Sequence, residues 1–375
     1  MDLPVYLDHN ATTPLAPGVL DTVTSYLREE FGNPSSGHHY GRAPRQAVAT
    51  ARAQLADLIG VAPDRIVFTG CGSEANTLAV RGVTEGRTGH IITQATEHPA
   101  ILQTCQALTA QGIRLTVLPV DTHGRVRPDD LAEALAEDTI LVSVMHANNE
   151  TGTIQPIAEL AALAHDAGAL FHTDAAQTTG KLAYTVDDLD ADLLTVAGHK
   201  FGAPKGVGAL YIRDGVVVQP VIRGGGQEHG LRSGTENVAG IAGLGAAAAY
   251  AHASLAEYHD RLTALRDRLY GLLREALGDR LSLNGDPDDR LPNTLNISIA
   301  ATNGAQLLAA VPQIAASTGS ACHDGSVSSP VLSAMGLNAD RVAGAIRLSL
   351  GRTTTPADVE YAAQLLIAAA NATGV

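Results

Sequence analysis

The sequence predicts an α/β fold in which a mostly parallel sheet is flanked by helices, followed by a smaller α/β unit. Two patterns lead to this prediction. Between residues 50 and 215, short apolar runs rich in β-forming residues alternate with Ala-rich helical segments, which is typical of a helix-flanked parallel sheet. Beyond Gly245 this alternation gives way to a long helical region with two further strand-like runs.

Seven runs are predicted to be the strands of the larger sheet. They cover residues 65–69, 90–93, 114–120, 140–145, 169–173, 193–196 and 207–212. Most are continuously apolar rather than alternating, as strands are when helices cover both faces of their sheet. Ligands of such sheets bind beyond the carboxyl ends of the strands, so the residues that follow each strand are the candidates for function.

The second unit is predicted to be the smaller one. Strands are expected at residues 294–299 and 345–350, and a terminal helix is expected after Thr355 and Pro356, because Pro favours the first turn of a helix. We therefore predict a large domain of residues 16–249 and a small domain of residues 1–15 and 250–375, which contains Cys322.

The overall composition limits the classes of function. The formal net charge is −14, and no run of Lys or Arg interleaves with aromatic residues, so direct binding to nucleic acid is not expected. The first ten residues lack the apolar segment of a secretory signal. The uncharged stretch 238–256 is Ala- and Gly-rich and contains a His, which favours a packed interior helix over a membrane span.

The chain has three cysteines, Cys71, Cys105 and Cys322, and none belongs to a CxxC pair. This argues against a disulfide framework and a structural zinc site and favours a reducing, cytoplasmic compartment. None of the fourteen His stands in a recognisable metal-binding spacing, so no metal is predicted. Cys322 lies in the Gly- and Ser-rich run STGSACHDGS, where a lone thiol is either inert or a reactive nucleophile.

The first candidate strand runs into GCGSEAN, residues 70–76. Small residues such as Gly72 and the hydroxyl of Ser73, at the start of a helix, can hold a phosphate through backbone N–H groups and the helix dipole. The segment is neither a Walker loop, because no GK[ST] follows, nor a dinucleotide fingerprint, because Ala75 stands where a third Gly is needed. A plain strand-to-helix turn remains the alternative.

Two charged residues follow neighbouring strands. Asp174 ends an apolar strand, where a carboxylate is costly unless it is paired, and Gln177 follows it. The next strand ends in AGHK, which places Lys200 at the carboxyl end of that strand. A desolvated lysine can form an imine with a carbonyl. An Asp facing a pyridinium nitrogen and a lysine Schiff base are the parts of a pyridoxal phosphate site. A simple ion pair between Asp174 and Lys200 is the alternative.

Three further residues have a functional and a structural interpretation. His98 is either a ring-stacking acid or base or a satisfied surface His. Asn149, in HANNE, either hydrogen-bonds a ligand or caps a turn. Arg347, in an apolar strand, is either a bidentate clamp for a carboxylate or half of a structural salt bridge.

The sequence as a whole resembles the cysteine desulfurases, in the class V aminotransferase-like group of pyridoxal phosphate enzymes with the type I fold. Nine motifs in the shared order carry the resemblance over nearly the whole chain. They are YLDHNATTP (6–14), FGNPSS (31–36), TEHPA (96–100), NNETGTIQP (148–156), HTDAAQ (172–177), GHKFGAPKGVGALY (198–211), GGGQEHGLRSGTEN (224–237), GSAC (319–322) and IRLSLGR (346–352).

The resemblance implies a role for each matching residue. Lys200 would hold pyridoxal 5'-phosphate covalently, Asp174 would pair with its ring nitrogen, and His98 would stack on its ring. Gln177 and Asn149 would contact the phenolic oxygen of the cofactor. Its phosphate would be bound by Gly72, Ser73 and His199. Thr235 would come from the partner subunit of a homodimer. Arg347, helped by Asn149, would bind the substrate carboxylate, and Cys322 would accept the sulfur.

The activity implied is removal of sulfur from L-cysteine, which gives L-alanine and a persulfide on Cys322 for delivery to an acceptor protein. Iron-sulfur cluster assembly, transfer-RNA thiolation and DNA phosphorothioation remain open as destinations, and His98 and His323 remain open as the base for the thiol. A selenocysteine lyase, another class V enzyme and a non-catalytic sulfur-transfer scaffold are the alternatives.

Two positions depart from the family pattern. Ala197 stands where the family has a Ser on the phosphate, which removes one hydroxyl contact. The segment between Cys322 and the AMG at residues 334–336 is about one residue shorter than in common members of the subgroup with a long, mobile loop. That subgroup still matches the sequence better than the short-loop type does.

Overall fold

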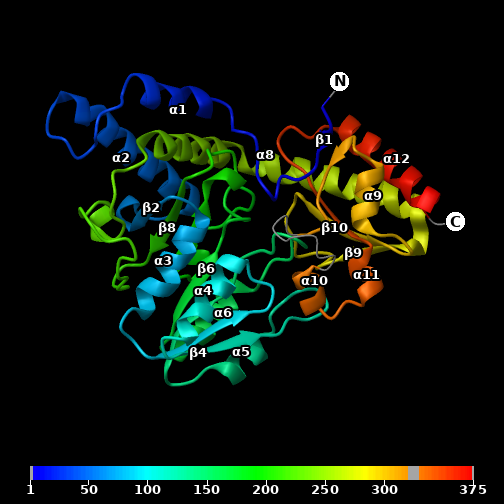
Figure 1. Cartoon of the computed structure of the whole chain (residues 1–375), viewed down its shortest axis with the longest axis horizontal. Helices are drawn as coiled ribbons and strands as arrows, with labels where there is room; N and C mark the ends of the chain where they lie inside the picture. The colour runs from blue at the N-terminus through cyan, green and yellow to red at the C-terminus, as the bar shows by residue number, and fades with distance from the viewer. Residues whose placement is uncertain (1–2, 320–328, 374–375) are drawn as a thin grey trace.

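In the computed structural model, residues 3–319 and 329–373 of the chain are described. They form two α/β units that lie side by side, with one long helix running along both (Figure 1). Cys322 and His323 lie outside the described residues, so the predictions about them stay predictions.

The larger unit is built on a seven-stranded sheet with the strand order β2-β8-β7-β6-β5-β3-β4. Its strands are β2 (Ile66–Thr69), β3 (Gly89–Gln94), β4 (Ile113–Leu118), β5 (Thr139–Ser143), β6 (Leu170–Asp174), β7 (Leu193–Ala197) and β8 (Gly208–Ile212). Each matches one predicted strand to within a few residues. Neighbouring pairs are parallel except those made by β8, which runs antiparallel to both β7 and β2. The α/β fold with a mainly parallel sheet is confirmed.

Helices cover both faces of this sheet. They are α1 (Val19–Arg28), α2 (His39–Ile59), α3 (Gly72–Thr84), α4 (Pro99–Thr109), α5 (Pro128–Ala134), α6 (Ile157–Asp166) and α7 (Val186–Leu189), with the short 3-10 turns η1 (Pro63–Arg65), η2 (Gly198–Lys200) and η3 (Glu228–Gly230). Successive strand residues belong to different cores: Ile92 packs with α2 and α6, and Ile91 packs with α3 and α4. Burial on both sides explains why these strands are continuously apolar.

The smaller unit contains an antiparallel sheet with the order β12-β10-β9. Its elements are η4 (Gly278–Arg280), β9 (Leu281–Asn284), β10 (Thr294–Ile299), α9 (Gly304–Ala310), α10 (Pro330–Ala334), α11 (Ala339–Ala343), β12 (Ala345–Ser349) and α12 (Pro356–Thr373). A parallel pair joins β1 (Val5–Tyr6) to β11 (Ile314–Ala315), so the first described strand packs in this unit.

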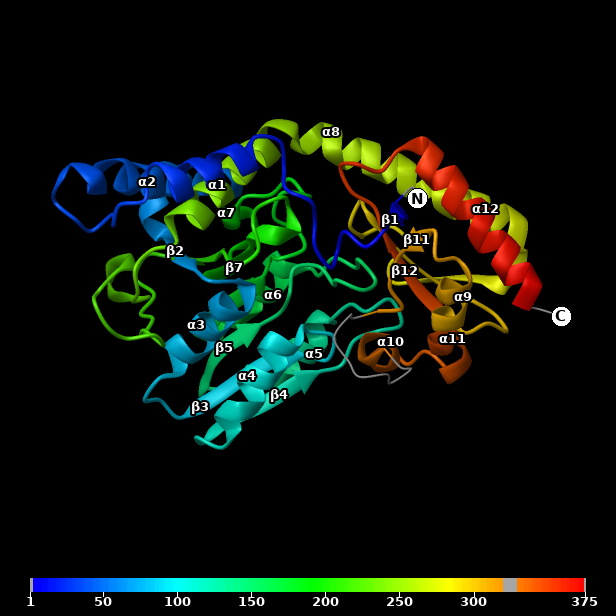
Figure 2. The same ribbon diagram turned by 45° about the horizontal axis from the view of Figure 1, so that its top comes forward.

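The helix α8 (Val238–Leu277) connects the two units (Figure 2). Residues up to Ala251 pack in the core of the larger unit, and those from Tyr258 onward pack in the core of the smaller one. The predicted boundary at residue 249 therefore falls inside a continuous helix. Among the described residues, α8 is the one helix long and apolar enough to cross a membrane, and more than half of its most apolar window is buried inside the protein.

Candidate active site

A cavity of about 290 Å³ opens beyond the carboxyl ends of the parallel strands. It is lined by residues at or after the ends of β2, β3, β5, β6 and β7, by Asn10 and Ala11 of the N-terminal segment, and by Arg347 from β12. The predicted residues Gly72, Ser73, His98, Asn149, Asp174, Gln177, His199, Lys200 and Arg347 all line it. Strands distant in sequence thus bring nearly the whole predicted site together, as the rule for parallel sheets requires.

Two predicted site residues are not in this group. Thr235 lines a separate pocket with Glu228 and Arg232, and its expected role in another subunit stays a prediction. Cys322 lies outside the described residues. Among the residues that the structure describes, no group of three His, Cys, Asp or Glu side chains could hold a metal ion.

Asp174 is the last residue of β6, and its side chain is almost fully buried. Asn76 Nδ2 donates a hydrogen bond to Asp174 Oδ2 over 2.7 Å, and the Ala176 N–H donates to Oδ1 over 2.9 Å. These two donors fix the position of the buried carboxyl group. Asp174 forms no salt bridge with a described residue, so the simple ion pair with Lys200 is not the arrangement found.

Lys200 is the last residue of η2, directly after β7. Its Nζ donates to the backbone carbonyls of Asn10 over 2.6 Å and Ala11 over 3.0 Å. The N-terminal segment therefore reaches across from the small unit and holds the lysine amine at the wall of the cavity.

Gln177 is held by a second, fully buried lysine. Lys181 Nζ donates to Gln177 Oε1 over 2.8 Å and to Asn10 Oδ1 over 3.3 Å, and Gln177 Nε2 donates to the Asn10 carbonyl over 3.0 Å. Burial, with further lowering by Lys200 and Arg347, takes the pKa of Lys181 well below its usual 10.5. The orientation of the Gln177 amide is fixed because its oxygen faces a donor and its nitrogen faces an acceptor.

His98 is the N-cap of α4, and its Nδ1 accepts a hydrogen bond from the Ala100 N–H over 3.1 Å. The ring is exposed to the open cavity, yet desolvation by the surrounding protein lowers the pKa of His98, with Lys200 lowering it further and Asp174 opposing this. The imidazole is therefore neutral at pH 7. Because Nδ1 accepts, the proton of this neutral ring is on Nε2.

The phosphate end predicted for the cavity lies at the start of α3. The helix begins at Gly72, and the N-cap residue Cys71 gives no side-chain cap to the first-turn N–H groups. A Cβ at position 72 would lie 3.0 Å from the Ala197 Cβ, so the turn needs a glycine to pack against the end of β7. His199 lines the same region; burial, followed by the charge of Lys200, lowers its pKa to about 4.

Arg347 comes from β12 and is only 2 % exposed. Its Nη2 pairs with Asp8 Oδ1 at 2.6 Å, and its Nη1 donates to the Asn149 carbonyl over 3.0 Å. The structural salt bridge considered for Arg347 is thus present. Its Nε is buried and has no acceptor among the described residues, so the guanidinium retains a donor that its protein partners do not use.

These residues fit pyridoxal 5'-phosphate. The uncapped N-terminus of α3 suits a phosphate, the buried Asp174 carboxyl suits a pyridine nitrogen, and Lys200 supplies the amine that binds an aldehyde. In the structure, Asn76 and the Ala176 N–H donate hydrogen bonds to Asp174, and Lys200 donates to the carbonyls of Asn10 and Ala11.

Sequence reasoning missed three residues that hold the site together. Asn76 lies within the quoted GCGSEAN, one helical turn after Gly72, where an amide in an otherwise apolar helix face was a usable signal. Asn10 accepts hydrogen bonds from Gln177 and Lys200 although it lies more than 160 positions before them. Lys181, four positions after Gln177, donates to Gln177 and Asn10.

Comparisons with known proteins agree with this geometry. Residues 5–362 match the family described as aminotransferase class V. The chain is 46 % identical to a protein from Dictyoglomus turgidum named cysteine desulfurase IscS, over 96 % of this chain and 93 % of that one. Among solved structures it is similar to a NifS-like protein (TM-score 0.91, 37 % identity, covering 98 % and 99 % of the two chains). It is also similar to SspA in complex with cysteine (TM-score 0.82, 35 % identity, covering 94 % and 100 %).

Proposed function

The chain belongs to the class V aminotransferase family and is a cysteine desulfurase, and from that premise we propose that it uses pyridoxal 5'-phosphate to convert L-cysteine into L-alanine and a persulfide on Cys322. One observation carries the proposal: Lys200, Asp174 and the uncapped start of α3 all face a single cavity at the carboxyl edge of the sheet.

Each lining residue has a part in holding the cofactor. Lys200 would bind its aldehyde, Asp174 would face its ring nitrogen, and the backbone of Gly72 and Ser73 would bind its phosphate. When bound, the cofactor withdraws electrons from the Cα of an attached amino acid. Asn76 supports this indirectly, because its hydrogen bond holds the Asp174 carboxyl group in position.

Lys200 and His98 are the groups that can move protons here. The amine of Lys200 would take the proton from the substrate Cα, as general acid-base catalysis requires of a group at the cavity wall. His98 is neutral and holds its proton on Nε2, because Nδ1 is occupied by the Ala100 N–H. In this state the Nε2–H of His98 can donate a hydrogen bond to a sulfur or nitrogen atom in the cavity.

Substrate binding is assigned to Arg347. Its guanidinium lines the cavity, and Asp8 and the Asn149 carbonyl fix the plane of this group. Hydrogen bonds between a guanidinium and a carboxylate are charge-assisted and directional, so they orient the amino acid with respect to Lys200.

The test of this function measures L-alanine and sulfide from L-cysteine in Cys322→Ser, with Cys71→Ser as the matched control. Cys71 is an exposed thiol that lines the cavity, whereas Cys105 is buried and its pKa is raised to about 12, mainly by desolvation. We expect loss of sulfur transfer in Cys322→Ser, with the cofactor's visible absorbance retained, and near-normal transfer in Cys71→Ser. Sulfur transfer at the wild-type rate in Cys322→Ser would overturn the assignment of the sulfur acceptor.

Attachment of the cofactor is tested separately with borohydride. Reduction followed by peptide mass spectrometry is expected to find the cofactor on Lys200. The chain has two other lysines, of which Lys181 is buried and Lys205 is exposed. An adduct on either of these would contradict the role of Lys200, whatever the outcome for Cys322.

We further propose that the enzyme is a cytoplasmic homodimer that passes its sulfur to an acceptor protein for iron-sulfur cluster assembly. The relative named IscS supports the pathway, and the exposed side chains of Val217, Val221 and Ile222, in the segment before Thr235, suit a subunit contact. Light scattering tests the dimer, and capture with persulfidated enzyme tests the acceptor. A monomer with full activity would rule out a required Thr235 from a partner subunit.

A further inference from the structure

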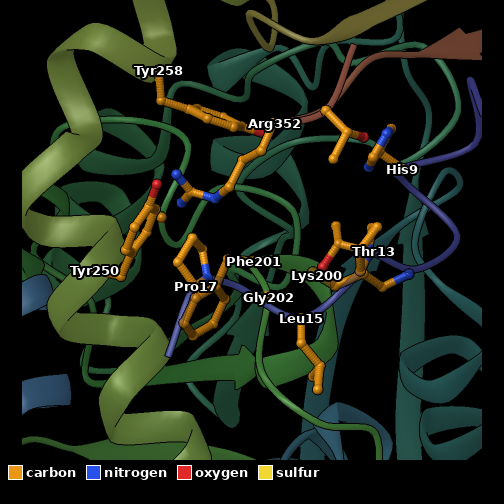
Figure 3. A pocket seen from close by; sticks show the side chains of 13 residues that line it. His9, Thr13, Leu15, Pro17, Lys200, Phe201, Gly202, Tyr250, Tyr258 and Arg352 are labelled. Atoms are coloured by element: carbon orange, nitrogen blue, oxygen red, sulfur yellow. The ribbon is translucent and has the colours of Figure 1, made fainter. Parts of the chain in front are cut away.

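A second cavity, of about 340 Å³, lies behind Lys200 (Figure 3). It is enclosed by the N-terminal segment, the turn after Lys200 and the helix α8, and it shares only Lys200 with the first cavity. Its walls are mainly apolar, with Pro17 and Phe201 on one side and the rings of Tyr250 and Tyr258 from α8 on another. Its size is within the range of small-molecule sites, and the proposed desulfurase chemistry gives it no role.

Arg352 places a positive charge in this cavity. Its guanidinium lies over the rings of Tyr250 and Tyr258, with its central carbon 4.5 and 4.8 Å from their centroids, and its Nη1 donates to Ser254 Oγ over 3.1 Å. Among the described residues no Asp or Glu forms a salt bridge with Arg352. Burial lowers the pKa of Arg352, Tyr258 and Tyr250 oppose this, and the neighbouring Arg261 adds to the lowering. A partly buried guanidinium without an anion is a costly arrangement that an anionic ligand would relieve.

His9 lines the opposite side of the cavity (Figure 3). The residue is 1 % exposed, and neither ring nitrogen has a partner with hydrogen-bond geometry among the described residues, although the Tyr6 carbonyl is near enough to affect its proton affinity. The ring is fixed between the edge contact with Tyr6, at 4.8 Å between centroids, and the backbone of Gly351. A buried polar side chain without a partner is unusual in a folded protein and points to a missing ligand or water.

We propose that this second cavity binds a small organic acid with an apolar body, whose carboxylate pairs with Arg352 and whose body lies against Tyr250, Tyr258 and Phe201. His9 offers a hydrogen bond to a further polar group on the ligand. The occupant differs from the substrate of the first cavity, because that substrate's carboxylate is assigned to Arg347, which belongs to the other cavity.

The test uses benzoate, a flat acid with an apolar ring, on cofactor-loaded enzyme that has been reduced with borohydride so that Lys200 no longer exchanges amines. Titration calorimetry on the wild type is expected to give one saturable site with a dissociation constant of about 1 mM or tighter. Benzyl alcohol, which lacks the carboxylate, should bind at least about tenfold more weakly, because hydrogen bonds to charged groups are the stronger ones.

Matched arginine variants locate the site. Arg352→Gln should weaken benzoate binding at least about tenfold, whereas Arg347→Gln should leave it within about twofold because Arg347 lies in the other cavity. Leu15→Trp changes a half-exposed residue at the cavity wall and should weaken binding by filling the space, with Arg352 intact. This second variant keeps the test decisive if Arg352→Gln does not fold.

Three results would overturn the proposal. They are no saturable benzoate binding up to about 10 mM, equal affinity for benzoate and benzyl alcohol, or loss of binding in Arg347→Gln but not in Arg352→Gln. The last result would place the acid in the first cavity and leave Arg352 as a structural clamp between two tyrosines. None of these outcomes depends on whether sulfur is transferred to Cys322.

Discussion

Glu97 makes the stability of this protein depend on pH in a way that Glu97→Gln should remove. The carboxyl group is buried next to His98; its Oε1 accepts from Gln94 Nε2 over 3.2 Å and from the Met145 N–H, while its Oε2 has no partner. Desolvation, with a smaller contribution from Asp174, raises the pKa of Glu97 from 4.5 to about 8 against the lowering effect of these donors. At pH 7 the folded protein therefore holds a proton that the unfolded chain releases.

The magnitude follows from the two pKa values. Because the folded state binds the extra proton, the free energy of unfolding falls as pH rises from 4.5 to 8 and changes no further above 8. At pH 7 the cost of Glu97 is about 3 kcal/mol, since the interval of 2.5 units above 4.5 is worth about 1.4 kcal/mol per unit. At pH 5 the same calculation leaves less than about 1 kcal/mol.

Gln cannot ionise, so the stability of Glu97→Gln relative to the wild type should rise by about 2 to 3 kcal/mol between pH 5 and pH 7. The new amide leaves an N–H group without an acceptor at the Oε2 position, but that cost is the same at both pH values. Urea unfolding followed by circular dichroism at the two pH values measures the difference. Glu137→Gln, at an exposed site, is the control and should show no such rise; parallel pH profiles of the wild type and Glu97→Gln would refute the reasoning.

Three further predictions follow from single contacts. Burial lowers the pKa of Lys181, so the unfolded chain binds a proton that the folded chain does not, and the free energy of unfolding should rise as the pH rises toward 10.5. This pH dependence should vanish in Lys181→Met and persist in the exposed control Lys205→Met. Urea unfolding between pH 7 and 10 measures it. Ala197→Ser should tighten cofactor binding about fivefold by restoring one hydroxyl donor, and an unchanged dissociation constant would show that position 197 does not face the phosphate. Gly351→Ala would place a Cβ 2.1 Å from His9 Nδ1. The substitution should therefore lower the free energy of unfolding by about 1 to 3 kcal/mol and weaken benzoate binding. An unchanged free energy of unfolding would contradict this packing.

The strands of the large sheet could be predicted because their burial is nearly uniform. Continuous apolar runs such as residues 140–145 report burial on both faces, and the observed β5 has no exposed residue. The direction of a strand is a different property. Nothing in GALYI indicates that β8 runs antiparallel to β7, because direction depends on how the chain enters the strand. The short β9 was missed since its two central residues are only partly buried.

The site was predictable where residues follow strands and unpredictable where they arrive from elsewhere. Asp174 and Lys200 were indicated by their place after β6 and β7, because the carboxyl edge of a parallel sheet gathers such residues. Their partners obey no such rule. Asn10 reaches Lys200 from 190 positions away, and its contacts depend on the small unit folding back over the sheet.

The two arginines of IRLSLGR show most clearly what the sequence leaves undetermined. Both have the same charge and lie five positions apart, and sequence reasoning assigned an anion only to Arg347. In the fold, Asp8 already compensates Arg347 at 2.6 Å, whereas Arg352 leaves the strand and meets two tyrosine rings and a serine hydroxyl. Whether an arginine is paired with an anion depends on which carboxylates the tertiary structure brings near it. Arg352 is therefore the arginine whose charge is less compensated by carboxylates. The sequence does not indicate this difference, because it depends on the packing of α8 against the N-terminal segment.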